Sequence, residues 1–555
     1  MFLNLLSATK SVLKNAYLKI NAVIIVLAVI GLSIVGHYGI SSDEAIEISM
    51  VKWNFELVTQ GKPMPNKLMK YYGTVFNFTS EVVFQAKEFW DDIGINNSIL
   101  SSRKRKKNIN NSDKFYERIK VKHICTFLVS LITYASVAGI VGILAGRQYA
   151  WFGAVVLALF PRFWGHSFFN PKDIPFAAMF TLATFLGACL VDYYLKADQN
   201  NIKLGINRVT LYSLLYGVLV GFVTGTRIGG FFLLFFVVIA HLLAVLVKKK
   251  NYRKLYRFWS LYGLMVISWM TTITIIHPAS WSNPIGWFIE TLRYLSKHGW
   301  SGTVLFEGQF ISAHQLPWYY LPKWFLMTIP GIFIIMFFLG LLLLIIKLKK
   351  LNDTQTVCVV LVLLQIFTLP TIAILRQSTI YDGVRQFLFV IPGIAAIAAT
   401  ALLWIYQKLH RKNYKIFFAV LIITLFSPIV FDMVNLHPYE YVYFNRISGG
   451  LVQADNRYET DYWGLSMRDG MEWINNNSIA GEIVVSSSQL HSSKTFAKHN
   501  INVISHGKFK KLGTTQAFYY IARPRWDFQE RFPECPVVYS VNRQGVPLTI
   551  VKKCG

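Results

Sequence analysis

Long apolar segments recur along this chain and constrain its fold more than any other feature. A helix needs roughly 17 to 25 apolar residues to cross the hydrocarbon core of a bilayer. Because backbone groups in lipid must find their hydrogen bonds within their own segment, such runs are expected to be helical. By this length rule we predict about eleven crossings, at residues 19–37, 121–145, 150–162, 174–195, 209–226, 229–247, 258–277, 323–346, 355–375, 385–406 and 415–432.

The composition agrees with a membrane protein. Hydrophobic residues make up 54% of the chain and charged residues 15%, whereas soluble domains carry about 25% charged residues. We therefore predict an all-α polytopic membrane protein. Segment 150–162 is short for a full crossing, so we expect it to be tilted or partly buried in protein, and the count is open by one span.

Basic residues beside short loops favour the cytoplasmic side of a membrane. Lysines precede the first span, and basic clusters at 248–257, 347–350 and 408–415 fall on the same predicted side. Almost all of the 28 acidic residues fall in the predicted outer segments. The N-terminus is therefore predicted to be cytoplasmic, in a multi-pass protein of the inner (plasma) membrane, with a long first outer loop at 38–120.

The character of the chain changes after the last predicted span. We predict a transmembrane domain at 1–432, which includes the first outer loop, and an extracytoplasmic α/β domain at 433–555. Short β-rich runs separated by polar, Gly and Pro residues support the second domain. These runs are 482–488, 501–505, 517–522 and 546–551, with a helical stretch near 464–477. Whether Cys535 and Cys554 pair in this domain is open, because pairing requires an oxidising compartment.

A net charge of +28 is compatible with a nucleic-acid partner or with a membrane surface. Topology-determining cations beside anionic membrane lipids explain the excess more simply, so we predict no nucleic-acid partner. A further basic cluster, Arg103 to Lys107, lies in the first outer loop. It is interpreted as a solvated insertion, with contact to anionic lipid or glycan as the alternative.

Several cations lie in short outer loops, against the charge bias that sets the orientation. They are Arg162, Lys172, Arg227 and Arg385. A cation kept beside a membrane span indicates an anionic partner such as phosphate, which Arg grips with two parallel hydrogen bonds. The alternative is that each cation pairs with a nearby carboxylate or extends to lipid headgroups. We favour a phosphate site for the set as a whole.

Carboxylates lie in the same predicted outer loops. Asp43 and Glu44 follow the first span, and Asp173 precedes a later one. An Asp at the membrane surface can take a proton from a hydroxyl that attacks an activated carbon, while cations stabilise the departing phosphate. This chemistry is glycosyl transfer from a lipid-phosphate sugar. The structural alternative is that Asp43 and Asp173 cap the helices that follow them.

Four stretches of sequence together resemble the GT-C superfamily of integral membrane glycosyltransferases. The closest branch includes bacterial protein O-mannosyltransferase-like enzymes and the aminoarabinose transferase of lipid A. The similarity covers residues 1 to about 430, and its most specific part is Pro161-Arg-Phe-Trp-Gly-His-Ser-Phe-Phe-Asn-Pro-Lys-Asp173. The other stretches are Asp43-Glu44, Tyr381 to Pro392 and Tyr458 to Gly464.

This resemblance implies an inverting transferase that uses a polyprenyl-phosphate-linked sugar donor and an unknown glycan, lipid or protein acceptor. Asp43 matches the probable base, with Glu44 beside it, and Asp173 matches a second acidic position. The implied substrate-binding residues are Lys70, Arg162, His166, Asn170, Lys172, Arg227, Tyr381, Asp382 and Arg385. No metal-ligand set is evident in the sequence. We therefore assign no cofactor, and the need for a divalent metal is left open.

Two other functional classes are compatible with the pattern. A transporter or flippase for a lipid-linked or anionic substrate would place charges along a pathway through the membrane. Against it, the predicted spans carry few acidic residues near mid-membrane and show no inverted repeat. A lipid phosphatase or phosphotransferase would need a nucleophile such as His166 or Ser167, but a histidine among aromatic residues is more often structural.

Overall fold

The computed structural model describes residues 10–97, 111–199, 208–247, 258–296, 300–513 and 516–555. Within these residues, ten helices are long and apolar enough to cross a membrane. The predicted polytopic helical architecture is confirmed. The spanning helices are α1 (Lys10–Ile34), α5 (Asn111–Ala145), α8 (Asp173–Gln199), α9 (Arg208–Thr226), α10 (Phe232–Val247), α11 (Trp259–Ile276), α14 (Gly331–Lys347), α15 (Asp353–Leu375), α16 (Ile391–Lys408) and α17 (Lys412–Leu436).

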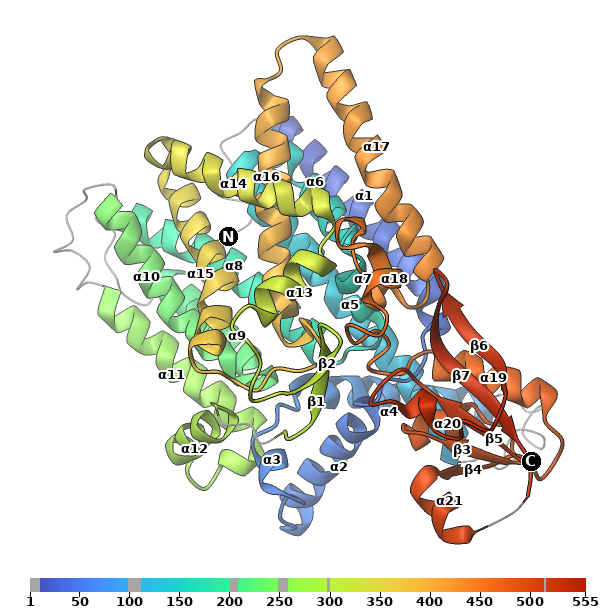
Figure 1. Ribbon diagram of the computed structural model, residues 1–555. Coiled ribbons are helices and arrows are strands. Elements are labelled where there is room, and N and C mark those ends of the chain that lie inside the picture. The colour runs from blue at the N-terminus through green and yellow to red at the C-terminus, as the bar shows by residue number, and fades with distance from the viewer. Residues whose placement is uncertain (1–9, 98–110, 200–207, 248–257, 297–299, 514–515) are drawn as a thin grey trace.

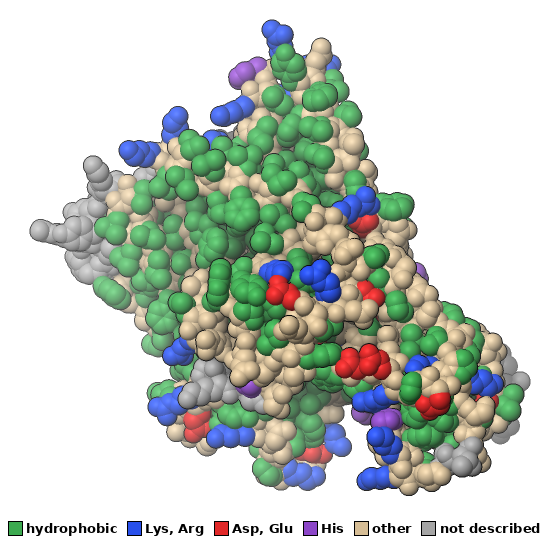
Figure 2. All heavy atoms as spheres, viewed as in Figure 1, with side chains coloured by type: hydrophobic (Ala, Val, Ile, Leu, Met, Phe, Trp, Pro, Cys, Tyr) green, Lys and Arg blue, Asp and Glu red, His purple; other side chains and the backbone are tan. Residues whose placement is uncertain are grey.

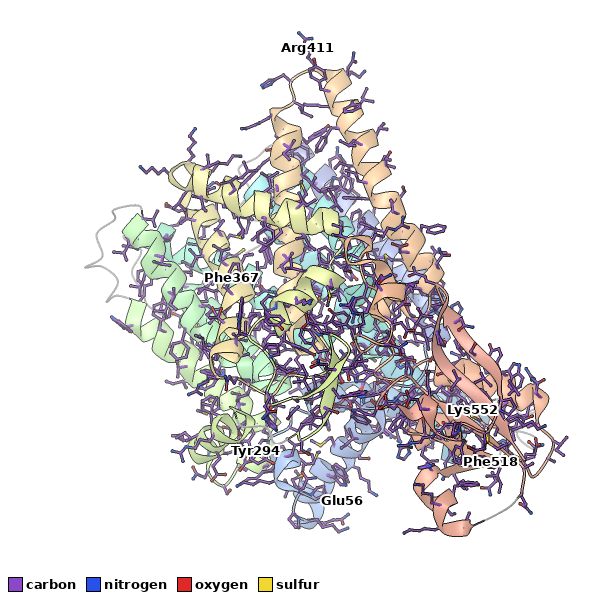
Figure 3. All side chains as sticks on the ribbon, viewed as in Figure 1. Glu56, Tyr294, Phe367, Arg411, Phe518 and Lys552 are labelled. Atoms are coloured by element: carbon purple, nitrogen blue, oxygen red, sulfur yellow. A yellow bond between two sulfur atoms is a disulfide. The ribbon has the colours of Figure 1, made fainter. Side chains whose placement is uncertain are left out.

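The spans form one bundle, and the helices of the first outer loop lie at the same end of it as the C-terminal sheet (Figure 1). Arg411, between α16 and α17, lies at the opposite end of the molecule from Glu56 and Lys552 (Figure 3). Hydrophobic side chains cover the visible surface of the bundle (Figure 2), as lipid-facing helices require. We call the end that holds the first-loop helices and the C-terminal sheet the outer end, after the orientation predicted from the sequence.

The short predicted span at 150–162 is a broken helix. Helices α6 (Trp151–Ala158) and α7 (Pro161–Phe169) meet at an angle of 77°. Pro161 is the first residue of α7, and the residue before a proline is driven out of helical geometry. The break keeps the whole of α7 buried beside the outer end of the bundle.

A second proline changes the predicted span 323–346. The structure has two helices there, α13 (Tyr320–Thr328) and α14, separated at Ile329 and Pro330. Only α14 is long enough to cross. Helix α13 lies at the outer end, where Trp324 is fully buried.

The first outer loop is largely helical. It contains α2 (Glu44–Gln60), α3 (Lys67–Lys70) and α4 (Val75–Asn97). Two glycines allow it to pack closely: a β-carbon at Gly39 would overlap the backbone of Leu465, and one at Gly73 would overlap that of Thr226. Close backbone approach thus fixes this loop against the end of α9 and the C-terminal region.

The outer end also contains elements that the sequence did not predict. Helix α12 (Pro284–Ser296) follows α11, and strands β1 (Thr303–Phe306) and β2 (Gln309–Ser312) form an antiparallel hairpin. Three short 3-10 turns belong here too: η3 (Ile228–Phe231), η7 (Arg385–Val390) and η8 (Glu440–Val442). These elements cover the ends of the spans and supply much of the candidate site.

The C-terminal part has the predicted α/β character. Its five-stranded sheet has the order β4-β3-β5-β7-β6, parallel across β4-β3-β5 and antiparallel across β5-β7-β6. Cys535 and Cys554 form a disulfide, which settles the pairing that the sequence left open. The elements are α18 (Gly450–Ala454), α19 (Met467–Asn477), β3 (Ile483–Ser486), α20 (Leu490–Phe496), β4 (Asn502–Ser505), α21 (His506–Leu512), β5 (Phe518–Ala522), β6 (Val537–Arg543) and β7 (Val546–Cys554).

The apolar cores show how the C-terminal part joins the bundle. Buried side chains of residues 439–465 belong to the large core shared with the spans, whereas two smaller cores flank the sheet. The segment 439–465 therefore anchors the sheet to the outer end of the bundle. The domain boundary at 432 stays a prediction, and the basic clusters 103–107 and 248–257 lie outside the described residues.

Candidate active site

A cluster of carboxylates and arginines lies at the outer end of the bundle, where side chains from the first loop, the spans and the C-terminal part converge. Asp43 immediately precedes α2, and Asp173 begins α8. Arg227 follows α9, and Arg385 begins η7. Four segments that are far apart in the sequence therefore meet at one place.

Arg385 is the centre of this cluster. Its Nη1 lies 3.3 Å from Asp43 Oδ2 and 3.6 Å from Asp173 Oδ2, and its Nε donates to Asp382 Oδ2 at 2.9 Å. Its guanidinium also lies over the ring of Tyr381. The side chain is only 5% exposed, and this burial is tolerable because the charge has three carboxylate partners.

Asp173 is held from two further directions. Arg227 Nη2 forms an ion pair with Asp173 Oδ1, and Asn170 Nδ2 donates to Oδ2 at 3.0 Å. The backbone N–H of Asp173 donates to Asn170 Oδ1 at 2.9 Å. Asn170 therefore caps the start of α8. The carboxylate of Asp173 pairs with the arginines instead of forming a capping hydrogen bond.

The exposure of the three aspartates differs sharply. The side chain of Asp43 is 33% exposed, whereas those of Asp173 and Asp382 are 2% and 3% exposed. Asp43 occupies the N-cap position of α2, but its side chain makes no capping hydrogen bond. Asp43 is thus the carboxylate of this cluster that an incoming substrate can reach.

Asp382 links the cluster to the C-terminal part. Asp382 and Gly383 both have left-handed backbone, with φ of 59° and 65°, a conformation that Asp and Gly adopt more readily than other residues. Asp382 Oδ1 lies 2.8 Å from Arg525 Nη2, which is 3.6 Å from Glu459 Oε1. Arg525 was not predicted as a site residue, although the sequence has a pair of arginines, Arg523-Pro-Arg525, among the β-rich runs.

Lys172 and Tyr381 lie beside the cluster. The ammonium of Lys172 lies over the ring of Tyr72. Burial, together with the charge of Arg227 nearby, lowers the pKa of Lys172 to about 7. Tyr381 stacks on Trp300 with ring centroids 4.4 Å apart. Both predicted residues are therefore near the carboxylates, and Lys172 can gain or lose its charge near neutral pH.

Arg162 and His166 lie on α7, behind the cluster. Arg162 donates to the carbonyl of Tyr443 at 2.8 Å and is surrounded by Trp324 and Phe444. His166 is paired with the hydroxyl of Tyr462 at 2.9 Å and lies 3.3 Å from Asn170 Nδ2. Both side chains are buried. His166 contacts Asn170, which holds Asp173, and lies among aromatic rings.

Glu44 and Lys70 have partners outside the cluster. Glu44 is fully buried, accepts from the backbone N–H of Ser41 at 2.8 Å and pairs with His123 at 2.9 Å. Lys70 pairs with Glu290 of α12 at 3.4 Å. The structure therefore brings neither side chain to Arg385, although the sequence grouped both with the site.

A metal ion needs several converging ligands. Among the described residues, no group of three or more His, Cys, Asp and Glu side chains is arranged to hold one. The three aspartates of the cluster instead share arginine partners. The chemistry that these residues offer is electrostatic stabilisation of an anion and proton acceptance by a carboxylate.

Known proteins were compared with this chain at the levels of sequence and structure. No protein-family model matches the sequence, and no curated protein matches it. The structure matches that of ArnT from Cupriavidus metallidurans bound to undecaprenyl phosphate, with 14% identity, 79% of this chain and 87% of that chain covered, and a TM-score of 0.39. It also matches the apo form of the Archaeoglobus fulgidus oligosaccharyltransferase, with 11% identity and a TM-score of 0.48. That match covers 90% of this chain and 69% of the oligosaccharyltransferase.

These neighbours are glycosyltransferases of the GT-C fold. A third match is the archaeal oligosaccharyltransferase AglB from Archaeoglobus fulgidus in complex with an inhibitory peptide and a dolichol-phosphate. The identity is 11% and the TM-score 0.47, and the match covers 86% of this chain and 64% of that chain. The group is the one that the sequence resembles.

Proposed function

We propose that this protein is an inverting membrane glycosyltransferase that moves a sugar from a polyprenyl-phosphate donor to a hydroxyl-bearing acceptor on the outer side of the membrane. One observation carries the proposal: Asp43 is the partly exposed carboxylate of a cluster that also holds two arginines, Arg227 and Arg385. A base and an anion site at the membrane surface are the two parts that this reaction requires.

The reaction is a single displacement. An acceptor hydroxyl oxygen attacks the anomeric carbon of the donor sugar, and Asp43 takes the proton as the new carbon–oxygen bond forms. The bond between the anomeric carbon and the phosphate oxygen breaks, and the electron pair leaves with the polyprenyl phosphate. Because attack and departure occur on opposite faces of the carbon, the configuration inverts. Phosphate departs readily, so one base and electrostatic stabilisation suffice, unlike the two carboxyl groups of glycoside hydrolysis.

Arg227 and Arg385 are proposed to bind the donor phosphate. Arg227 is 22% exposed and pairs with Asp173 through Nη2. The other N–H groups of its guanidinium can therefore donate hydrogen bonds to an anion. Arg forms two parallel hydrogen bonds to phosphate oxygens. Lys172 adds a positive charge when it is protonated. Asp173 and Asp382 are proposed to position Arg385, because both are almost fully buried.

The proposed sidedness follows from the charge pattern of the inner loops. We propose that the N-terminus is cytoplasmic and that the site faces outward in the plasma membrane. In its support, Lys408 and Arg411 lie at the end of the bundle opposite α2 and the sheet (Figure 3), and such cations favour the cytoplasm.

Label transfer tests the function and names the acceptor class. Membranes that contain the protein, and matched membranes without it, are supplied with polyprenyl phosphates carrying different radiolabelled sugars. We expect label from one donor to appear in a lipid, glycan or protein fraction only when the protein is present. Equal labelling in both membranes with every donor would contradict the proposal and favour the transporter or flippase alternative.

A further inference from the structure

A pocket lies where the β1–β2 hairpin meets the segment 455–460 and the loop 524–530. Its volume is about 540 Å³, including the part open to solvent. Two exposed aromatic side chains line it, Phe310 at 44% and Trp526 at 37% exposed, beside the buried Tyr458 and Phe528. The indole N–H of Trp526 donates to the carbonyl of Thr303 at 2.9 Å. This bond fixes the ring beside the hairpin, so the pocket offers a rigid aromatic surface next to solvent.

Carboxylates dominate the polar lining of this pocket. Asp455, Glu459, Asp527 and Glu530 line it together with Arg525, and Arg525 is already paired with Asp382 and Glu459. Figure 2 shows an acidic patch where the body of the molecule meets the C-terminal part. In a chain with a net charge of +28, this is a local reversal of charge, and it would repel the donor's phosphate.

Glu459 points to a ligand in the pocket. Its side chain is 4% exposed, and among the described residues Oε2 has no hydrogen-bond partner. An unpaired buried carboxyl oxygen lowers stability, because its lost contact with water is not replaced. A ligand hydroxyl in the pocket would satisfy it. Burial raises the pKa of Glu459 to about 7, although the charge of Arg525 lowers it. Near neutral pH this carboxyl can therefore accept a hydrogen bond when ionised and donate one when protonated.

We propose that this pocket binds a sugar ring of the acceptor, with its hydroxyls on the carboxylates and its C–H face on Trp526. Carboxylate oxygens accept hydrogen bonds from hydroxyls, and aromatic faces bury apolar C–H surface. The acceptor is therefore a glycan or a glycosylated molecule. This assignment rests on the proposed transferase function, since Glu459 reaches the catalytic cluster through Arg525 and Asp382.

Binding of simple glycosides to the purified full-length protein tests the proposal. The probes are methyl glycosides of glucose, galactose, mannose and N-acetylglucosamine, detected by saturation-transfer difference NMR. We expect at least one of them to bind, and its dissociation constant to rise 10-fold or more in Trp526→Ala and in Asp527→Asn. Trp526→Phe, which keeps an aromatic face, and Glu534→Gln, which removes an exposed carboxyl outside the pocket, should bind within 3-fold of wild type.

Two comparisons make the result decisive. Asp43→Asn should keep glycoside binding even though it removes the proposed base, so loss of transfer and loss of this pocket are separate outcomes. Melting temperature and gel-filtration profile identify any variant that is misfolded, in which case Asp527→Asn replaces Trp526→Ala. The proposal is overturned if no glycoside binds to wild type, if neither pocket variant weakens binding, or if tetramethylammonium binds there and glycosides do not.

Discussion

At the scale of single residues, the site depends on how much of each charged side chain reaches solvent. Asp43 and Asp173 are both aspartates at helix starts, and it was the family resemblance that named Asp43 as the probable base and Asp173 as a second acidic position. The structure separates them, because Asn170 and two arginines enclose Asp173 whereas Asp43 stays 33% exposed. Exposure depends on residues distant in the chain, so local sequence could not have ranked the two.

Replacing Arg385 by Lys should weaken the donor site. Arg385 contacts Asp382 through Nε, and Asp43 and Asp173 through Nη1. A lysine has a single charged nitrogen and cannot contact the aspartates from two positions in this way. We expect the KM for the sugar donor to rise and kcat to fall. The ratio kcat/KM should be lower by about 10²-fold or more, as when a preorganised hydrogen-bond donor is removed. Transfer rates over a range of donor concentrations measure this, and Arg411→Lys at the opposite end should match wild type.

Lys172 should make donor binding depend on pH. Its pKa is lowered to about 7, so its positive charge is present below this pH and is lost as pH rises through it. We expect the donor KM to increase above about pH 7. In Lys172→Arg the charge persists, and the donor KM should be flat over the same range. A wild-type KM with no such increase, or an equal increase in Lys172→Arg, would remove Lys172 from the phosphate site.

At the scale of elements, the length of the apolar segments predicted most of the membrane spans. The elements that were predicted wrongly or not at all have local causes. Segment 150–162 is bent at Pro161, and 323–346 is divided at Pro330. Strands β1 and β2 are four residues each, too short for an alternating pattern to be recognised. The β6 strand was missed as well, although its partner β7 was expected.

The close contact of Gly39 should control how the first loop docks. A β-carbon there would overlap the backbone of Leu465, and backbone cannot move aside as a flexible side chain does. We expect Gly39→Ala to lower stability by about 1–3 kcal/mol and to reduce transfer, because Asp43 follows four residues later. Gly36→Ala is a matched control, since nothing lies within 4 Å of its position. Thermal unfolding in detergent compares the two variants, and equal melting temperatures would refute the docking role.

At the scale of the whole molecule, the candidate site is shared between the bundle and the C-terminal part. Asp382 and Arg525 lie on different elements far apart in the chain, and their ion pair is buried. No periodicity or spacing in the sequence connects them, which is why Arg525 was not predicted. The membrane region was predictable because lipid imposes one rule on every span, whereas the partners of a buried charge are chosen by tertiary structure.

Removal of Arg525 should therefore affect activity and stability together. Arg525→Met removes the arginine that pairs with Glu459 and one of the two arginines that pair with Asp382, which keeps Arg385. Breaking a buried pair in this way costs about 3–5 kcal/mol. We expect a lower melting temperature and a lower transfer rate. In a double-mutant cycle with Asp382→Asn, the two losses should be less than additive. Full additivity would show that the two residues act independently.

The orientation has a direct test with cysteines at the two ends of the bundle. Glu56→Cys lies on α2 and Arg411→Cys lies beyond α16 (Figure 3). In sealed right-side-out membranes, a membrane-impermeant maleimide should label the first variant at once and the second only after permeabilisation. The reverse pattern would invert the topology and move the site to the cytoplasmic side.

The most direct test of the central claim is sugar transfer by Asp43→Asn at expression matched to wild type. Asparagine keeps the size of the side chain but cannot take the proton, so we expect the transfer rate to fall about 10²- to 10⁴-fold, the range of general-base catalysis. Donor binding should persist. Asp91→Asn, an exposed aspartate of α4 paired with Lys87, should transfer at the wild-type rate. Transfer by Asp43→Asn equal to that of wild type would contradict the account.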